Sequence, residues 1–212
     1  MDFKSQLQSA RLLPIITLKS EKQISIIKKV IEKSSIEMVE IAFRSELAAK
    51  AIEEFSTLEN VSVGAGTVKT LEQARIAVDA GSKFLVSPGY NPEVVKYASD
   101  KNIPITPGVL TPTEILKGMN EANITVFKIF PANIIGGLTA IKALSGPFYD
   151  VDFLPTGGVN KDNFIEFLQE PQIICVGGSF IINDSINESE ITSEIEKIND
   201  LVSKAKAVKK II

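Results

Sequence analysis

The sequence contains no histidine and only one cysteine among its 212 residues. Without an imidazole, the Ser-His-Asp and Cys-His forms of nucleophilic catalysis are excluded, as are zinc sites with histidine ligands. Cys175 has no partner within the chain for a disulfide, which is typical of proteins in a reducing cytosol. If the protein is an enzyme, glutamate, aspartate, lysine, tyrosine or bound water must move its protons.

The sequence also lacks an excess of positive charge and a long apolar run. Lys and Arg total 23 against 26 for Asp and Glu, so no basic field exists to hold nucleic acid. No run approaches the ~18 apolar residues that span a membrane. The apolar stretch at residues 12–18 is too short for a signal sequence and contains Pro14. We therefore expect a cytoplasmic protein with neither nucleic acid nor a membrane as partner.

Short apolar runs rich in β-branched residues recur along the whole chain. Their continuous hydrophobicity predicts parallel strands that are covered on both faces. They begin 19 to 27 residues apart, which is enough chain for a strand, a turn and a three-turn helix. The predicted strands are residues 13–18, 38–43, 61–66, 84–87, 103–106, 126–130, 153–156 and 173–176.

The segments between these runs have the periodicity and the caps of helices. Residues 21–33 carry an apolar stripe, and residues 70–80 open with the capping box Thr-Leu-Glu-Gln. Thr111-Pro112-Thr113-Glu114 predicts a capped start with proline in the first turn. Residues 188–210 form the longest predicted helix, with acids in its first half and lysines in its second.

Eight strand–helix units predict an α/β protein, a (β/α)8 or TIM barrel in a single domain over residues 1–212. Residues 2–11 predict an extra helix over the N-terminal face of the barrel. The alternative is an open, doubly wound sheet. It is disfavoured because Gly64-Ala65-Gly66-Thr67 follows a strand without the third glycine of a dinucleotide-binding turn.

In such a barrel, functional residues gather where the strands end. Lys128 lies inside the apolar run Val126-Phe127-Lys128-Ile129-Phe130. A buried ammonium is costly without a partner, so such a lysine is either neutral or paired. As a neutral amine it would attack a carbonyl carbon and form a Schiff base. The alternatives are a structural ion pair or a lysine whose charged end reaches solvent.

Glu40 and Arg44 share one face of the second predicted strand. The period of two places Met38, Glu40, Ala42 and Arg44 together, facing inward. Glu40 beside Lys128 is either a buried salt bridge or a general acid/base for the carbon bound to the lysine. Arg44 is either a surface arginine or a bidentate ligand for a substrate carboxylate at the barrel mouth.

Polar residues and glycines occupy the other strand ends, where packing alone would favour Val or Ile. Glycine pairs follow the last two predicted strands, where barrels often bind phosphate through backbone N–H groups. Ser179 would add a hydroxyl donor, although such glycines are also common in plain turns. These ends read Gly66-Thr67, Ser87-Pro88-Gly89, Thr106-Pro107-Gly108, Thr156-Gly157-Gly158 and Gly177-Gly178-Ser179.

Six motifs in order resemble the bacterial 2-keto-3-deoxy-6-phosphogluconate (KDPG) aldolases, which often also act on 4-hydroxy-2-oxoglutarate (KHG). The resemblance runs nearly from end to end. The motifs are Val39-Glu40-Ile41-Ala42-Phe43-Arg44, Gly64-Ala65-Gly66-Thr67-Val68, Ser87-Pro88-Gly89, Phe127-Lys128-Ile129-Phe130-Pro131-Ala132, Pro155-Thr156-Gly157-Gly158 and Gly177-Gly178-Ser179.

The resemblance implies a class I aldolase that is typically a homotrimer, needs neither metal nor cofactor, and acts on a small keto-acid phosphate. Lys128 matches the Schiff-base lysine and Glu40 the general acid/base. Two groups of residues match the substrate-binding site. Arg44, Thr67, Pro88 and Phe130 match the residues around the pyruvyl group, and Thr156, Gly157, Gly158, Gly178 and Ser179 match the distal phosphate pocket.

The chain departs from the family at Ser35, Ala42, Asn123 and Asn133, where many members have Gly, Thr, Gly and Glu. Ala42 and Asn133 lie near the expected site and bear on substrate preference. Three other functions remain open: an aldolase or decarboxylase for unphosphorylated keto acids, a phosphate-binding barrel isomerase or synthase without covalent catalysis, and a non-catalytic protein that binds phosphorylated ligands.

Overall fold

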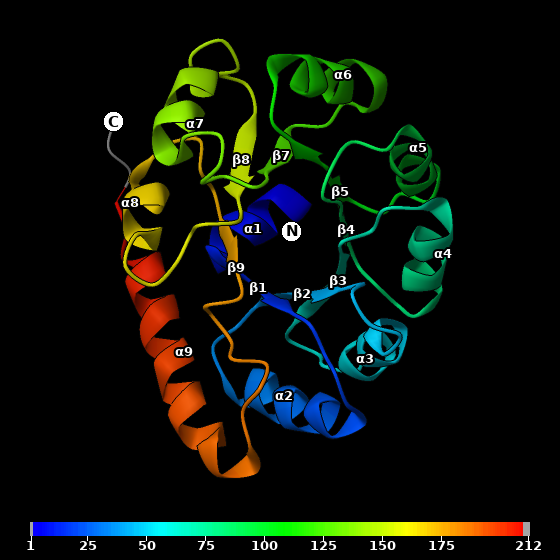
Figure 1. The fold of residues 1–212 in the computed structure, drawn as a ribbon, viewed down its shortest axis with the longest axis vertical. Coiled ribbons are helices and arrows are strands. Elements are labelled where there is room, and N and C mark those ends of the chain that lie inside the picture. The colour runs from blue at the N-terminus through cyan, green and yellow to red at the C-terminus, as the bar shows by residue number, and fades with distance from the viewer. Residues whose placement is uncertain (1, 210–212) are drawn as a thin grey trace.

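The structure is a computed structural model that describes residues 2–209. Its strands form a ring surrounded by helices (Figure 1). The strands are β1 Leu12–Ile16, β2 Met38–Ala42, β3 Ser62–Gly66, β4 Leu85–Val86, β5 Ile105–Thr106, β6 Gly108–Val109, β7 Val126–Ile129, β8 Asp152–Pro155 and β9 Val176–Gly178. The helices are α1 Phe3–Ala10, α2 Glu21–Lys33, α3 Ala48–Phe55, α4 Leu71–Asp79, α5 Pro92–Asp100, α6 Pro112–Ala122, α7 Gly137–Ser145, α8 Phe164–Gln169 and α9 Ile191–Lys206, with a 3₁₀ turn at Glu188–Glu190.

The parallel strands close into a barrel. One sheet has the order β5-β4-β3-β2-β1-β9 and the other β6-β7-β8. Bridges from Phe153 to Ile173 and from Thr156 to Gly177 join β8 to the last strand position. On the other side, β5 and β6 form one strand position that is interrupted only by Pro107. The first and last strands pair, so the (β/α)8 barrel is confirmed and the open sheet is wrong.

Side chains alternate between the barrel interior and the helix layer. Met38 packs in an interior cluster with residues from other strands, among them Val126 and Leu154. Val39 and Ile41 pack in the larger cluster between the strands and the surrounding helices. The period-two prediction for β2 is therefore confirmed, and the same alternation directs Glu40 into the barrel.

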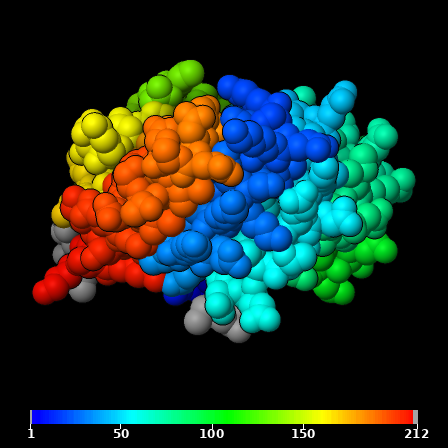
Figure 2. All heavy atoms as spheres, turned by 90° about the horizontal axis from the view of Figure 1, so that it is seen from below, coloured from blue at the N-terminus to red at the C-terminus, as the bar shows by residue number. Residues whose placement is uncertain are grey.

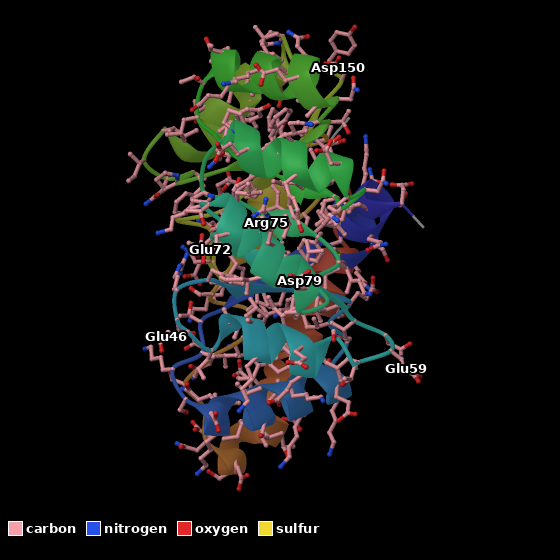
Figure 3. The ribbon with its side chains drawn as sticks, turned by 90° about the vertical axis from the view of Figure 1, so that its right-hand side faces the viewer. Glu46, Glu59, Glu72, Arg75, Asp79 and Asp150 are labelled. Carbon is pink, nitrogen blue, oxygen red and sulfur yellow. The ribbon has the colours of Figure 1, made fainter. Side chains whose placement is uncertain are left out.

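Helix α1 covers the N-terminal end of the barrel, as predicted. Leu7 and Ala10 are buried in the interior cluster, and Phe3 packs against it. In Figure 1 this helix crosses the centre of the ring. The side view of Figure 3 places Glu46, which follows β2, and Glu59, which precedes β3, on opposite sides of the molecule, with the dark blue α1 on the same side as Glu59.

Most predicted helix starts agree with the structure, and two details differ. Helix α6 begins with the reciprocal capping box of Thr111 and Glu114. In α4, Thr70 caps the N–H of Gln73, but the Gln73 side chain accepts from Lys69 instead of Thr70, so the predicted box is only half formed. The predicted helix over 188–210 begins as a 3₁₀ turn and becomes α-helical only at Ile191. It ends at Lys206, and residue 210 lies outside the described residues.

The last strand lies farther along the chain than predicted. Val176, Gly177 and Gly178 pair with β1, whereas the sequence places this strand at 173–176 and the two glycines just after its end. A Cβ on Gly177 would lie 2.6 Å from Thr156 Oγ1, so the glycine is needed inside the strand because a side chain would collide there.

Helix α9 packs against α2 on one side of the barrel. Figure 2 shows the red and orange α9 alongside the blue α2, and Asn199 of α9 accepts hydrogen bonds from the N–H and hydroxyl of Ser35. Lys206 pairs with Glu37, just before β2. Among residues 2–209, no helix is long and apolar enough to cross a membrane.

Candidate active site

The centre of the candidate site is an ion pair inside the barrel. Lys128 on β7 places its Nζ 3.5 Å from Oε1 of Glu40 on β2. The two residues are only 3% and 0% exposed. The Nζ also lies 5.3 Å from the centre of the Phe130 ring, where its charge faces an aromatic surface. The sequence predicts that Glu40 and Lys128 point inward from separate strands, and in the structure the two side chains are in contact.

Gly66 on β3 leaves the space that the Glu40 side chain occupies. A Cβ at this position would lie 1.9 Å from Glu40 Oε1, a distance that no side chain tolerates. Glu40 Oε2 is fully buried and has no hydrogen-bond partner among residues 2–209. An unpaired buried carboxylate oxygen costs free energy, so it is expected mainly where a ligand or water molecule uses it.

Three predicted binding residues stand where neighbouring strands end. Arg44 is exposed in the bend after β2, and Pro88 is half-buried after β4. Thr67 follows β3 with a φ of 57°, in the left-handed region that threonine rarely adopts. Such a conformation is retained where the surroundings determine it strongly, often at functional sites.

The predicted phosphate-binding residues follow β8 and β9. Gly157 and Gly158 have φ values of 85° and 88°, which glycine adopts without strain. Their carbonyls accept hydrogen bonds from the Asn133 N–H and the Asn163 side chain, which fixes the loop. Gly178 ends β9, and Ser179 follows it in an exposed turn.

Asn133 lies directly over this glycine loop. A Cβ on Gly158 would approach the Asn133 Cβ to 2.3 Å and its Nδ2 to 3.3 Å. Asn133, one of the residues that differ from the family pattern, therefore lies next to the predicted phosphate pocket. The side chain in contact with Gly158 is a neutral amide at the position where many members of the resembling family carry a carboxylate.

Thr106 is an interior polar residue to which the sequence assigned no role. It is 0% exposed, and its hydroxyl has no hydrogen-bond partner among residues 2–209. The sequence placed it at a strand end, but the two-residue strand before Pro107 shows no periodicity that would reveal its direction. The feature of the sequence that points to Thr106 is a hydroxyl at a strand position where packing favours an apolar side chain.

Cys175 is buried, as predicted, and its thiol is not suited to act as a nucleophile. Burial raises the pKa of its thiol well above the ordinary range, and the charge of nearby Glu40 acts in the same direction. The thiol therefore stays protonated and packs as a small apolar group.

A hollow of about 640 Å³ lies away from the candidate site, beside α1 at the N-terminal end of the barrel, and is lined by residues such as Glu59 and Lys83.

Comparison with known proteins identifies the family of this chain. The model of the KDPG and KHG aldolase family matches residues 3–198. The 2-dehydro-3-deoxy-phosphogluconate aldolase of Treponema pallidum is 37% identical over 177 residues, 83% of this chain and 84% of that protein. The KHG/KDPG aldolase of Escherichia coli is 32% identical over 196 residues, 92% of each chain.

Solved structures show the same fold. The 2-keto-3-deoxy-6-phosphogluconate aldolase of Zymomonas mobilis superposes with a TM-score of 0.88 at 29% identity, covering 99% of this chain and 98% of that one. The KDPG aldolase of Legionella pneumophila, captured with pyruvate as a covalent carbinolamine, gives 0.81 at 32% identity, covering 99% of each chain. By sequence and by fold, this chain belongs to the KDPG and KHG aldolase family.

Proposed function

We propose that this protein is a class I aldolase that cleaves KDPG to pyruvate and glyceraldehyde 3-phosphate, and also KHG to pyruvate and glyoxylate. The observation that carries this proposal is the buried contact between Lys128 and Glu40. It joins a candidate nucleophile to a candidate proton carrier inside the barrel, where both residues are buried. The names of the relatives support the same substrates.

Lys128 forms the covalent intermediate in this proposal. Glu40, 3.5 Å away, takes a proton from the Lys128 ammonium, and the neutral amine then adds to the C2 ketone of the substrate to give a carbinolamine. The carbinolamine hydroxyl takes the proton back from Glu40 and leaves as water, which gives an iminium. The iminium carbon accepts the electron pair that is released when the C3–C4 bond breaks. The carbinolamine captured in the Legionella pneumophila relative supports this chemistry.

Glu40 moves the protons, directly or through a bound water. Its carboxylate takes the proton of the C4 hydroxyl, the C3–C4 bond breaks, and the aldehyde leaves. The electron pair of that bond forms a pyruvate enamine on Lys128. Protonation of the enamine at C3 and hydrolysis of the iminium then release pyruvate and restore the free amine.

The remaining predicted residues bind the two ends of the substrate. Arg44 and Thr67 hold the carboxylate next to the ketone, and Pro88 and Phe130 line that part of the site. Thr156, Gly157, Gly158, Gly178 and Ser179 hold the distal phosphate through backbone N–H groups and hydroxyls. The positive φ values of the glycine pair are compatible with such an anion-binding loop.

The scheme needs no metal and no cofactor, because the lysine supplies the electron sink. We also propose that the protein is a homotrimer, on the ground of its family resemblance. We further propose that it works in the cytoplasm, on the ground of its single buried cysteine. Size-exclusion chromatography with light scattering tests the trimer.

The catalytic proposal is tested by incubating the purified protein with KDPG and following the products by NMR. We expect pyruvate and glyceraldehyde 3-phosphate in equal amounts, and no cleavage by the Lys128→Ala variant. A folded wild-type protein that cleaves neither KDPG nor KHG would contradict the proposal. Cleavage of KHG alone would confine it to the unphosphorylated substrate.

A further inference from the structure

Four buried polar side chains lie in the barrel interior toward the C-terminal ends of the strands: Glu40, Thr106, Lys128 and Thr156. All of them except Thr106 have a role in the proposed reaction. Two buried polar residues elsewhere are paired: Ser82 donates to the Phe84 carbonyl, and Glu194 accepts from the N–H of Asn183. In residues 2–209, the buried atoms without a hydrogen-bond partner are Glu40 Oε2, Ser45 Oγ, Thr106 Oγ1 and Thr156 Oγ1.

The strand pairing directs Thr106 into the barrel. Its neighbour Ile105 packs against the outer cluster, and its register partner Val86 belongs to the interior cluster. The next residue, Pro107, accepts a 2.9 Å hydrogen bond from the Lys128 N–H, so Thr106 sits beside the strand that carries the lysine. It therefore shares the interior with the Lys128–Glu40 pair.

The hydroxyl of Thr106 makes no hydrogen bond to any of residues 2–209, so it forms no polar contact that valine would lack. An unpaired buried hydroxyl destabilises a protein, whereas valine has nearly the same shape and no polar group. Val86 shows that the adjacent strand accepts valine at the paired position. A polar group that is costly to folding and lies beside a reactive pair points to a use in the reaction.

We propose that Thr106 is a positioning residue for Glu40, and this inference rests on the proposed aldolase function. Glu40 Oε1 faces Lys128, which leaves Oε2 as the oxygen without a protein partner. The Thr106 hydroxyl donates to a water molecule that in turn donates to Oε2. This bridge satisfies both unpaired atoms and holds the carboxylate in the orientation from which it exchanges protons with the substrate.

The proton step can be measured apart from Schiff-base formation. Pyruvate alone forms the iminium with Lys128, and loss of a methyl proton then gives the enamine. In D₂O, the return of a deuteron replaces that proton, and NMR follows the exchange. Borohydride reduces the iminium and records its formation independently, so the two readouts separate the lysine from the carboxylate.

The test compares Thr106→Val, which keeps the shape, with Thr106→Ser, which keeps the hydroxyl. We expect Thr106→Val to trap pyruvate on Lys128 as wild type does, while methyl exchange and kcat for KDPG fall about tenfold, the size of a hydrogen bond to a charged group. The KM for KDPG should stay within about twofold, because ground-state binding is unchanged. Thr106→Ser should restore most of the exchange rate. Ser82→Ala removes a buried hydroxyl remote from the site and should leave exchange unchanged.

Other outcomes overturn the inference in distinguishable ways. Exchange at the wild-type rate in a Thr106→Val protein that traps pyruvate would show that Glu40 does not depend on the hydroxyl. Loss of trapping in a folded variant would place Thr106 with Lys128 instead. If the valine variant does not fold, equal exchange rates in Thr106→Ala and Thr106→Ser would refute the role. A wild-type protein that traps no pyruvate would refute the aldolase function, and this inference with it.

Discussion

The two ends of the barrel are built from the same strands and have opposite characters. At the N-terminal end, α1 buries Leu7 against an apolar cluster that includes Met38 and Leu154. Two residues farther along β2, at the next inward position, Glu40 meets Lys128. The interior residues under α1 are apolar, whereas the polar end keeps unpaired atoms on three of its interior residues, Glu40, Thr106 and Thr156.

This difference separates stability from function along one set of strands. Apolar side chains buried beneath α1 stabilise the fold, at roughly 25 cal/mol for each Å² removed from water. Unpaired polar groups at the other end oppose folding and are retained where they act on a ligand. Substitutions at the two ends should therefore change different properties, and the effect on turnover should fall from the Lys128 position to α1.

The largest effect on turnover is expected from Lys128→Ala. Without the amine no iminium forms and the electron pair of the C3–C4 bond has no acceptor, so activity should fall by at least about 10⁴-fold. Coupled assay of pyruvate release from KDPG measures this loss, and circular dichroism checks the fold. A folded variant that keeps more than a few per cent of the wild-type kcat would rule out covalent catalysis at this residue.

The second effect is expected from Glu40→Gln, which keeps the size of the side chain and removes its basicity. The variant should still form the imine with pyruvate, while kcat for KDPG falls by ~10² to 10⁴-fold. Steady-state kinetics and borohydride trapping on the same preparation separate the two steps. Full activity would show that another group carries the proton.

A smaller and selective effect is expected from Ser179→Ala. Loss of one hydrogen bond to a phosphate should lower kcat/KM for KDPG about tenfold. The unphosphorylated analogue 2-keto-3-deoxygluconate serves as the control, and its kcat/KM should not change. An equal loss with both substrates would place Ser179 outside the phosphate pocket.

The smallest effect on turnover, and a large one on stability, is expected from Leu7→Ala. Leu7 is fully buried, so truncation should lower the free energy of unfolding by about 3 kcal/mol. Denaturant titration measures this loss, and kcat and KM below the unfolding range should match wild type. Exposed Gln8 on the same helix provides the control, because Gln8→Ala should change neither property. A loss of kcat in Leu7→Ala would show that the two ends are not independent.

The sequence was sufficient to predict the barrel and the contact at its centre. Strand–helix spacing predicts the architecture, alternation along β2 directs Glu40 inward, and the apolar residues on both sides of Lys128 predict its burial. Prediction was wrong at the last strand: Gly177 and Gly178 follow an apolar run and look like the loop after it, yet they pair with β1. Glycine is found inside this strand because a Cβ on Gly177 would collide with Thr156. The sequence does not reveal the direction of Thr106, because the strand that it ends is only two residues long, which is too short for an alternation.

The most direct test of the account is to treat the protein with pyruvate and borohydride and to map the product by intact-protein and peptide mass spectrometry. We predict one reduced pyruvyl group per chain, attached to Lys128 and absent from the Lys128→Ala variant. A folded protein that carries no adduct, or carries it on a different lysine, would contradict the assignment of the buried Lys128–Glu40 pair as the catalytic centre.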